Sequence, residues 1–283
     1  MTIKYFHIEN FLDAETTDSL IYDLNKYVPQ ERVTKYFGGR YLLPNTDDKF
    51  DLLIQESISW KLLYERVNSN NFINLCLDNL GISSNKFIVK KYFTKHKSIY
   101  RRFAHKYAKR FVVHTSILGL LAYIIYRSYK LFFQKIFFLP YKLTNKIPVE
   151  LLFDVSRAAN GYSREIHRDS DSRAIVFLIY LNDLDSDGEG GELNLYEYCG
   201  AEKGDPPPTP EESVCKLLQS IEPRRGSLVA FENGNDSFHG VPLMSGYSSS
   251  RYFCYGSATV LNGKSPFLLK SKYELGTEFQ MYI

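Results

Sequence analysis

The sequence changes character at Pro148, and this change restricts the folds that the chain can adopt. Beyond Pro148, short apolar runs are separated by clusters of Gly, Asp, Asn and Pro, a pattern typical of an antiparallel β domain. The run 174–181 is apolar throughout, so we expect it to form a central strand that is covered on both faces. The other candidate strands are 149–156, 192–198, 227–231 and 250–260.

The residues before Pro148 carry helical signals instead. Asp13 has the character of an N-cap, acidic residues follow it, and apolar residues then recur at spacings of four and three. This pattern predicts a helix over 14–27, and a weaker periodicity predicts a second helix over 50–68. Segment 204–212 is polar and rich in proline, so we expect a surface excursion between strands there.

Length and composition indicate a globular protein. With 283 residues, of which 44% are hydrophobic, the chain as a whole is neither disordered nor a coiled coil. We expect three parts: a helical, basic and aromatic region over 1–148, a catalytic β domain over 149–262 and a C-terminal tail over 263–283.

Positive charge is concentrated in one stretch of the chain. Residues 79–149 contain fifteen Lys/Arg and no Asp/Glu, although the whole chain carries only +3. The uncharged run 111–126 would span about 24 Å as a helix, less than the roughly 30 Å of a bilayer core. Three interpretations of 111–139 stay open: it spans a membrane, it lies on an anionic membrane surface, or it packs against the β domain with its charges in solvent. Nucleic acid is not an expected partner, because no recognition module is visible.

Cysteine usage indicates a reducing compartment. The sequence has four cysteines, no Cys-x-x-Cys pair and no secretory leader after Met1. We interpret the four cysteines as small buried residues, and we expect a cytoplasmic protein that is peripheral to a membrane if the basic stretch binds one. They are Cys76, Cys199, Cys215 and Cys254.

A candidate metal site begins with His167 and Asp169. In an extended segment the side chains of residues i and i+2 point the same way, so both can reach one ion. A second histidine, His239, would come from another strand, and two histidines with one carboxylate hold Fe(II) while leaving three positions open. The alternative for His239 is a hydrogen-bonded loop histidine. The remaining histidines, which we expect to be structural or at the surface, are His7, His96, His105 and His114.

Arg251 lies twelve residues beyond His239, on the next predicted strand. A buried arginine is costly unless a carboxylate meets it, and a guanidinium binds a carboxylate through two hydrogen bonds. We therefore predict an anion anchor at Arg251, with an edge-strand arginine in solvent as the alternative. Four other arginines lie close in sequence to His167 and Asp169, and each would either bind an anionic substrate or be exposed to solvent. They are Arg157, Arg164, Arg168 and Arg173.

Five sequence elements between about 151 and 261 follow one another in a distinctive order. They are His167-x-Asp169, Tyr180-Leu-Asn, Gly190-Gly-Glu-Leu, the segment 223–231, and His239-Gly-Val-Pro with Arg251 downstream. In this order they resemble the iron(II)/2-oxoglutarate-dependent dioxygenases, and within that family the prolyl 4-hydroxylase-like branch. Residues 199–221 form an insertion relative to compact relatives, so the resemblance does not extend to the substrate rim.

The resemblance implies a fold and a site. The fold would be α+β with a mainly β catalytic core, a double-stranded β-helix of the jelly-roll or cupin-like type, with N-terminal supporting helices. His167, Asp169 and His239 would bind Fe(2+), Arg251 would pair with the distal carboxylate of 2-oxoglutarate, and Tyr180 would donate a second hydrogen bond to that carboxylate. The implied cofactors are Fe(2+), 2-oxoglutarate as cosubstrate and O2, with ascorbate as an optional addition.

The reaction that the resemblance implies is hydroxylation of a C–H bond with release of succinate and CO2. The substrate stays open among a protein side chain, a glycan or lipid group and a small metabolite. Two alternatives from other classes also stay open. One is a non-catalytic cupin-like metal-binding protein, and the other is a membrane-surface adaptor that works through the basic residues 79–149.

Overall fold

The computed structural model describes most of the β domain and the N-terminal helices. The described residues are 3–28, 35–36, 39–83, 87–90, 146–185, 187–200, 206–261 and 263–268. The interpretations of 111–139 lie outside them, as do those of His96, His105 and His114, and the division into three parts stays a prediction. None of the helices in the described ranges is long and apolar enough to cross a membrane.

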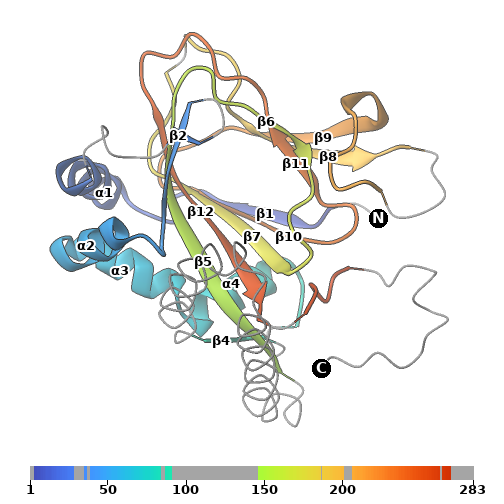
Figure 1. Ribbon diagram of the computed structural model, residues 1–283, viewed down its shortest axis with the longest axis horizontal. Coiled ribbons are helices and arrows are strands. Elements are labelled where there is room, and N and C mark those ends of the chain that lie inside the picture. Colours follow the sequence, from blue (N-terminus) through green and yellow to red (C-terminus); the bar gives the residue numbers. More distant parts are fainter. Residues whose placement is uncertain are drawn as a thin grey trace, which may run out of the picture.

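The larger of two sheets has eight strands and runs through the middle of the molecule (Figure 1). Its strands follow the order β1-β10-β7-β12-β5-β3-β2, and β4 pairs in parallel with β5. Because β12 pairs with β7 on one side and with β5 on the other, it is a central strand. The bounds are β1 Tyr5–Ile8, β2 Lys35–Tyr36, β3 Arg40–Pro44, β4 Phe87–Val89, β5 Ile147–Ala158, β7 Arg173–Tyr180, β10 Leu228–Glu232 and β12 Arg251–Val260.

The smaller sheet has four strands in the order β6-β11-β8-β9. Buried side chains from both sheets fill the space between them, including Leu178 and Phe231 of the larger sheet and Leu195 and Val241 of the smaller one. This packing of two mostly antiparallel sheets is the double-stranded β-helix that the sequence predicted. The bounds are β6 Arg164–His167, β8 Leu193–Tyr198, β9 Cys215–Ile221 and β11 Phe238–Val241.

Strand β7 separates two apolar cores, which confirms the expectation of a strand covered on both faces. Its side chains alternate with a period of two, so Val176, Leu178 and Tyr180 face the smaller sheet. Ile175, Phe177 and Ile179 face the opposite way, toward the helices. All eight of its residues except Arg173 are buried.

The helices cover the face of the larger sheet that points away from the smaller sheet (Figure 1). Helix α1, Ala14–Tyr27, has the predicted bounds, and the Asp13 side chain accepts a hydrogen bond from the Thr16 amide at 2.7 Å. Trp60 is fully buried and donates from its indole nitrogen to the Leu20 carbonyl at 2.8 Å, which links a later helix to α1.

The helical segment predicted over 50–68 is present, but it consists of two helices rather than one. They are α2, Asp48–Glu56, and α3, Ile58–Val67. Ser57 has extended backbone, ends α2 and accepts a hydrogen bond from the Trp60 amide at 3.2 Å, so it begins α3 as an N-cap. A further helix, α4 Asn70–Asn79, follows and was not predicted.

All five predicted strands are present, with ends that differ by at most two residues from the expected ones. The strands that the sequence did not predict are mostly short, since β1, β2, β3, β4, β6 and β11 have two to five residues each. Runs of this length contain too few side chains to establish a period of two.

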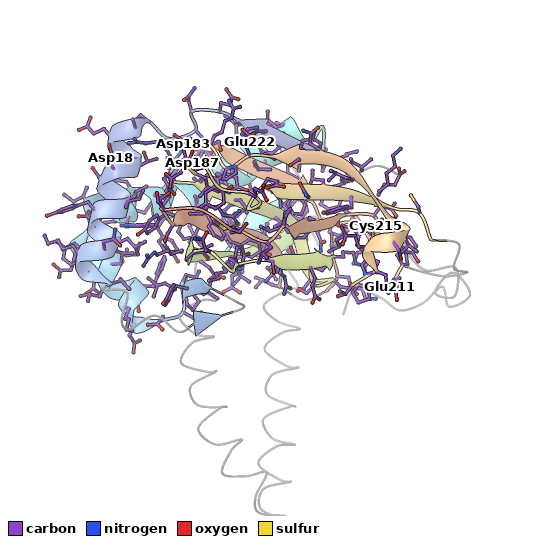
Figure 2. The ribbon with its side chains drawn as sticks, turned by 90° about the horizontal axis from the view of Figure 1, so that it is seen from above. Asp18, Asp183, Asp187, Glu211, Cys215 and Glu222 are labelled. Carbon is purple, nitrogen blue, oxygen red and sulfur yellow. The ribbon has the colours of Figure 1, made fainter. Side chains whose placement is uncertain are left out.

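The insertion 199–221 contributes the edge strand of the smaller sheet. In Figure 2 Glu211 and Cys215 lie at the end of the molecule opposite Asp18 of α1. The expectation of four buried cysteines is wrong for two of them. Cys199, which follows the end of β8, is exposed, and Cys215 is only half-buried because it lies on the edge strand β9.

The two-core arrangement predicts a large loss of stability when Phe177 is truncated. Its fully buried ring packs edge-to-face against Phe72 of α4, with ring centres 5.0 Å apart. We expect Phe177→Ala to lower the free energy of unfolding by about 3–5 kcal/mol in urea denaturation. Tyr22→Ala, which removes a ring that is 67% exposed, should cost less than about 0.5 kcal/mol. Equal costs for the two variants would contradict this account of the core.

Candidate metal centre between the two sheets

Pairing within the smaller sheet brings the two candidate histidine ligands together. His167 is the last residue of β6, and in the antiparallel register it lies directly opposite His239 of β11. The centres of the two imidazole rings are 4.4 Å apart. The pairing of β6 with β11 thus brings together two histidines that are 72 residues apart in the sequence. His239 belongs to strand β11, so the alternative of a loop histidine is wrong.

Asp169 completes the group from just beyond β6. Its Oδ2 lies 3.5 Å from Nε2 of His239, and ligand atoms of Asp169, His167 and His239 all lie within 4.8 Å of one another. Asp169 and His239 are buried, whereas His167 is half-buried. The structure therefore brings together the three residues that the sequence predicted as metal ligands, with a donor set suited to Fe(II).

Both imidazole rings are oriented by backbone carbonyls. Nδ1 of His167 lies 2.8 Å from the Glu165 carbonyl oxygen, and Nδ1 of His239 lies 3.3 Å from that of Ser237. A carbonyl only accepts, so Nδ1 carries the proton in each ring and donates it. Nε2 of each ring then has a free lone pair that can bind a metal. This is the usual arrangement of a metal-binding histidine, whose other ring nitrogen donates a hydrogen bond.

The histidines are neutral at physiological pH. Burial lowers the pKa of His167 to about 3, and the proximity of His239 acts in the same direction. Burial also lowers the pKa of His239, against the opposing effect of the Asp169 carboxylate. Metal binding needs neutral imidazole, so the folded protein holds both rings in the required protonation state.

Asp169 is held in place by two side chains that the sequence did not identify as its partners. The hydroxyl of Tyr255 donates to its carboxylate oxygens at 2.9 and 3.0 Å, and Arg173 donates from Nη1 to Oδ1. Burial alone would raise the pKa of Asp169, but His239, Arg173 and the Tyr255 hydrogen bond hold it below its usual value. The carboxylate is therefore charged, and its orientation is fixed.

Arg251 and Tyr180 lie in the same inter-sheet layer and are both completely buried. The Arg251 guanidinium carbon is 4.5 Å from the ring centre of Phe253 and 5.6 Å from that of Tyr180, and its Nη1 donates to the Gly191 carbonyl. No carboxylate of the described residues pairs with Arg251. The solvent-exposed alternative for Arg251 is therefore wrong.

Two buried polar atoms in this layer lack a hydrogen-bond partner, namely Nε of Arg251 and the hydroxyl oxygen of Tyr180. Burial raises the pKa of Tyr180 to about 12, so its hydroxyl keeps a proton to donate. Unpartnered buried donors of this kind are costly unless a ligand meets them. A carboxylate accepts from a guanidinium and a phenol together, so these residues fit the distal carboxylate of 2-oxoglutarate.

The remaining arginines near β6 have separate contacts. Arg173 is bound to Asp169, Arg157 donates from Nε to the Ser250 hydroxyl at 2.9 Å, and Arg168 lies 3.4 Å from a carboxylate oxygen of Asp171. Arg164 donates from Nε to Nε2 of His167 at 3.3 Å. Of the four, Arg173 has the strongest link to the candidate site, through a carboxylate four residues earlier in the chain.

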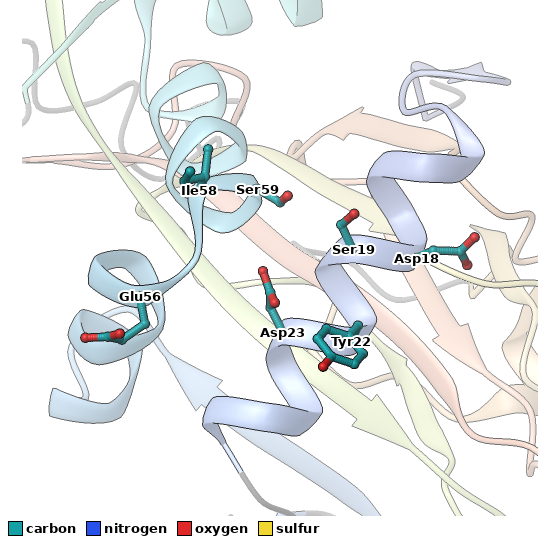
Figure 3. Close-up of a pocket in the computed structure, with 7 residues that line it drawn as sticks. All are labelled: Asp18, Ser19, Tyr22, Asp23, Glu56, Ile58 and Ser59. Carbon is teal, nitrogen blue, oxygen red and sulfur yellow. The ribbon is translucent and has the colours of Figure 1, made fainter.

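An open depression on the helical layer is unrelated to this group. It has a volume of about 460 Å³ and lies between α1, which contributes Asp18 and Tyr22, and the junction of α2 and α3 at Glu56 and Ile58 (Figure 3). Helices α1 to α3 cover the opposite face of the larger sheet from the histidines. This depression therefore does not form part of the candidate metal centre.

Comparison with known proteins finds one matching family model and several structures of similar fold. Residues 153–256 match the model of the 2OG-Fe(II) oxygenase superfamily. Prolyl 4-hydroxylase structures are similar in fold: one from Phytophthora capsici has a TM-score of 0.51 at 12% identity, covering 96% of this chain and 65% of that one. One from Pseudomonas putida has a TM-score of 0.44 at 14% identity, covering 92% and 94%. No curated protein sequence matches the chain.

The fold, the two-histidine-one-carboxylate group and the matched superfamily define the β domain as an Fe(II)- and 2-oxoglutarate-dependent oxygenase. Its double-stranded β-helix is the one found in the Phytophthora capsici prolyl 4-hydroxylase.

The hydrogen bonds to Asp169 predict that Tyr255 contributes to metal affinity. Tyr255→Phe removes only the hydroxyl that orients the carboxylate, and we expect the dissociation constant for Fe(II) to rise about 10- to 100-fold in anaerobic calorimetric titration. The control is Tyr252→Phe on the same strand, whose hydroxyl contacts Asn25 on the helical side at 3.3 Å. An equal effect of both variants would show that Tyr255 acts only through general stability.

The lowered histidine pKa values predict that the metal-free protein loses stability as the pH falls below about 6.5. The unfolded chain takes up protons there and the folded chain does not, so each histidine should lower the free energy of unfolding by about 1.4 kcal/mol per pH unit. The pKa of Asp154 is raised by burial to about 6 and acts in the opposite direction. Comparison of wild type with His167→Gln in urea denaturation cancels that contribution, and parallel pH curves would contradict the prediction.

Proposed function

We propose that the protein hydroxylates a C–H bond of its substrate in a reaction that consumes 2-oxoglutarate and O2 and releases succinate and CO2. One observation carries the proposal: a buried anion-binding pair, Arg251 and Tyr180, shares the inter-sheet layer with the His167, Asp169 and His239 group. A metal site that served structure alone would not need a fully buried guanidinium with an unpartnered nitrogen.

The spacing along β12 suits a cosubstrate that reaches from the metal to Arg251. Arg251, Phe253 and Tyr255 project from the same face of β12, because side chains alternate along a strand. Tyr255 holds Asp169, so about 13 Å of strand separates the backbone beside the metal group from the backbone of the anion anchor. Side chains from both ends extend into this interval, and Phe253 provides an apolar wall between them.

The roles of the residues follow from this arrangement. His167, Asp169 and His239 would hold Fe(II), and Arg251 and Tyr180 would hold the distal carboxylate of 2-oxoglutarate. Fe(II) with 2-oxoglutarate and O2 supplies an oxidant able to remove hydrogen from an unactivated C–H bond. The protein orients the ligands and keeps bulk water from the reacting atoms with the apolar core between the sheets.

The proposal is tested by succinate release from purified, iron-loaded protein. We expect turnover that depends on Fe(II) and O2 and is abolished in His167→Ala. Untargeted mass spectrometry of a lysate incubated with 2-oxoglutarate should show products heavier by one oxygen atom. Iron binding without succinate release would instead favour a non-catalytic metal-binding protein. The membrane-surface alternative depends on the basic stretch, most of which lies outside the described residues.

Arg251 should determine the affinity for 2-oxoglutarate and not that for iron. Arg251→Lys keeps the charge but loses the fork that binds a carboxylate through two hydrogen bonds, so we expect the KM for 2-oxoglutarate to rise about 10- to 100-fold. The dissociation constant for Fe(II) should change less than twofold. An unchanged KM would mean that another residue anchors the cosubstrate.

A further inference from the structure

Arg40 brings a further guanidinium into the inter-sheet layer, from the N-terminal part of the chain. It begins β3, where it lies opposite Ala158 of β5 in the register. Its Nε and Nη2 both donate to the hydroxyl of Ser156, at 3.1 and 2.8 Å. Ala158 belongs to the core between the sheets, so the Arg40 side chain lies on the face that carries the metal group.

The Arg40 guanidinium lies near two aromatic rings of β12, one beside the metal group and one beside Arg251. Its central carbon is 5.2 Å from the ring centre of Phe253, the ring that Arg251 also contacts, and 5.7 Å from that of Tyr255. The hydroxyl of Tyr255 donates to Asp169. One aromatic ring therefore separates Arg40 from a metal ligand, and another separates it from Arg251.

Arg40 has no ion-pair partner among the residues that the structure describes. Asp154 is close enough to Arg40 for the two side chains to interact electrostatically, and burial raises the pKa of the Asp154 carboxyl to about 6. Arg173, the other cation near Asp154, is already bound to Asp169. The hydrogen bonds of Arg40 to described residues come from Nε and Nη2 alone, and Nη1 is not a buried atom, so Nη1 is accessible to an incoming acceptor.

We propose that Arg40 binds a carboxylate of the substrate and so selects an acidic small molecule or acidic chain end. This inference rests on the proposed function and specifies its substrate class. The carboxylate would lie one tyrosine ring away from the metal group, which places the C–H bond to be hydroxylated a few bonds from the acid. A monoanion suits the position better than a phosphate dianion, because the Asp154 carboxyl group interacts electrostatically with Arg40 and would repel the additional negative charge.

The test measures succinate release by the full-length, iron-loaded protein with a panel of carboxylic acids. The panel contains N-acetyl amino acids, fatty acids and aromatic acids, each paired with its own primary amide. We expect at least one acid to raise succinate release above the substrate-free rate, with a KM at least tenfold lower than that of its amide. For that acid, Arg40→Gln should raise the KM at least tenfold, by a larger factor than it raises the KM for 2-oxoglutarate, and Arg40→Lys should raise it less.

The matched control is Arg157→Gln. Arg157 also donates to a serine hydroxyl and lies over two aromatic rings, Tyr41 and Tyr252, but on the helical side of the larger sheet. We expect it to change the KM for the acid less than twofold, and thermal melting of both variants checks their folding.

Three results would overturn the role of Arg40: acids and amides act alike, Arg40→Gln leaves the KM for the acid unchanged, or no acid raises the rate. Failure of the proposed function is recognised separately. In that case wild-type protein neither releases succinate in the absence of substrate nor develops the charge-transfer absorbance that 2-oxoglutarate gives with bound Fe(II) under anaerobic conditions.

Discussion

The alternation of side chains along β12 sets the positions of nearly everything in the site. This strand pairs along its length with β5 and β7, so its twist and register are fixed from both sides. Arg251, Phe253 and Tyr255 consequently project into the inter-sheet layer, while Cys254 and Ala258 join the core beneath the helices. A shift of one residue in this register would exchange the two sets and remove the site.

Electrostatics in the layer are matched to its ligands before any ligand binds. Burial keeps His167 and His239 neutral, and nearby donors keep Asp169 charged. Arg251, in contrast, is a buried charge that has no carboxylate partner among the described residues. Burial of this unpaired guanidinium is unfavourable, and the carboxylate of a dicarboxylic cosubstrate would offset the desolvation penalty on binding. The buried positive charge therefore favours an anionic ligand over a neutral one.

The sequence predicted the parts of this arrangement that depend on nearby residues. His167 and Asp169 lie two positions apart, and five longer strands show clear apolar patterns, so both could be inferred from local spacing. The support of Asp169 by Tyr255 spans 86 residues, and the contact of Arg40 with Ser156 spans 116. Such contacts depend on which strands become neighbours, and the short strand that carries Arg40 has no periodicity from which its neighbours could be predicted. Ser57 was a different kind of miss, since a serine inside an apolar pattern can either continue a helix or cap the next one.

One face of the larger sheet packs against the helices, and the other face carries the metal group. The arginines of β3 and β5 illustrate the difference between the two faces. Arg157 and Arg40 lie on neighbouring strands, each hydrogen-bonded to a serine and each close to aromatic rings. Arg157 faces the helices, where its contacts complete its environment. Arg40 is half-buried on the face that carries the metal group, in the same layer as Asp154 and the buried guanidinium of Arg251. Nearly identical local contacts thus have different consequences, because the period of the strand decides which face a cation reaches.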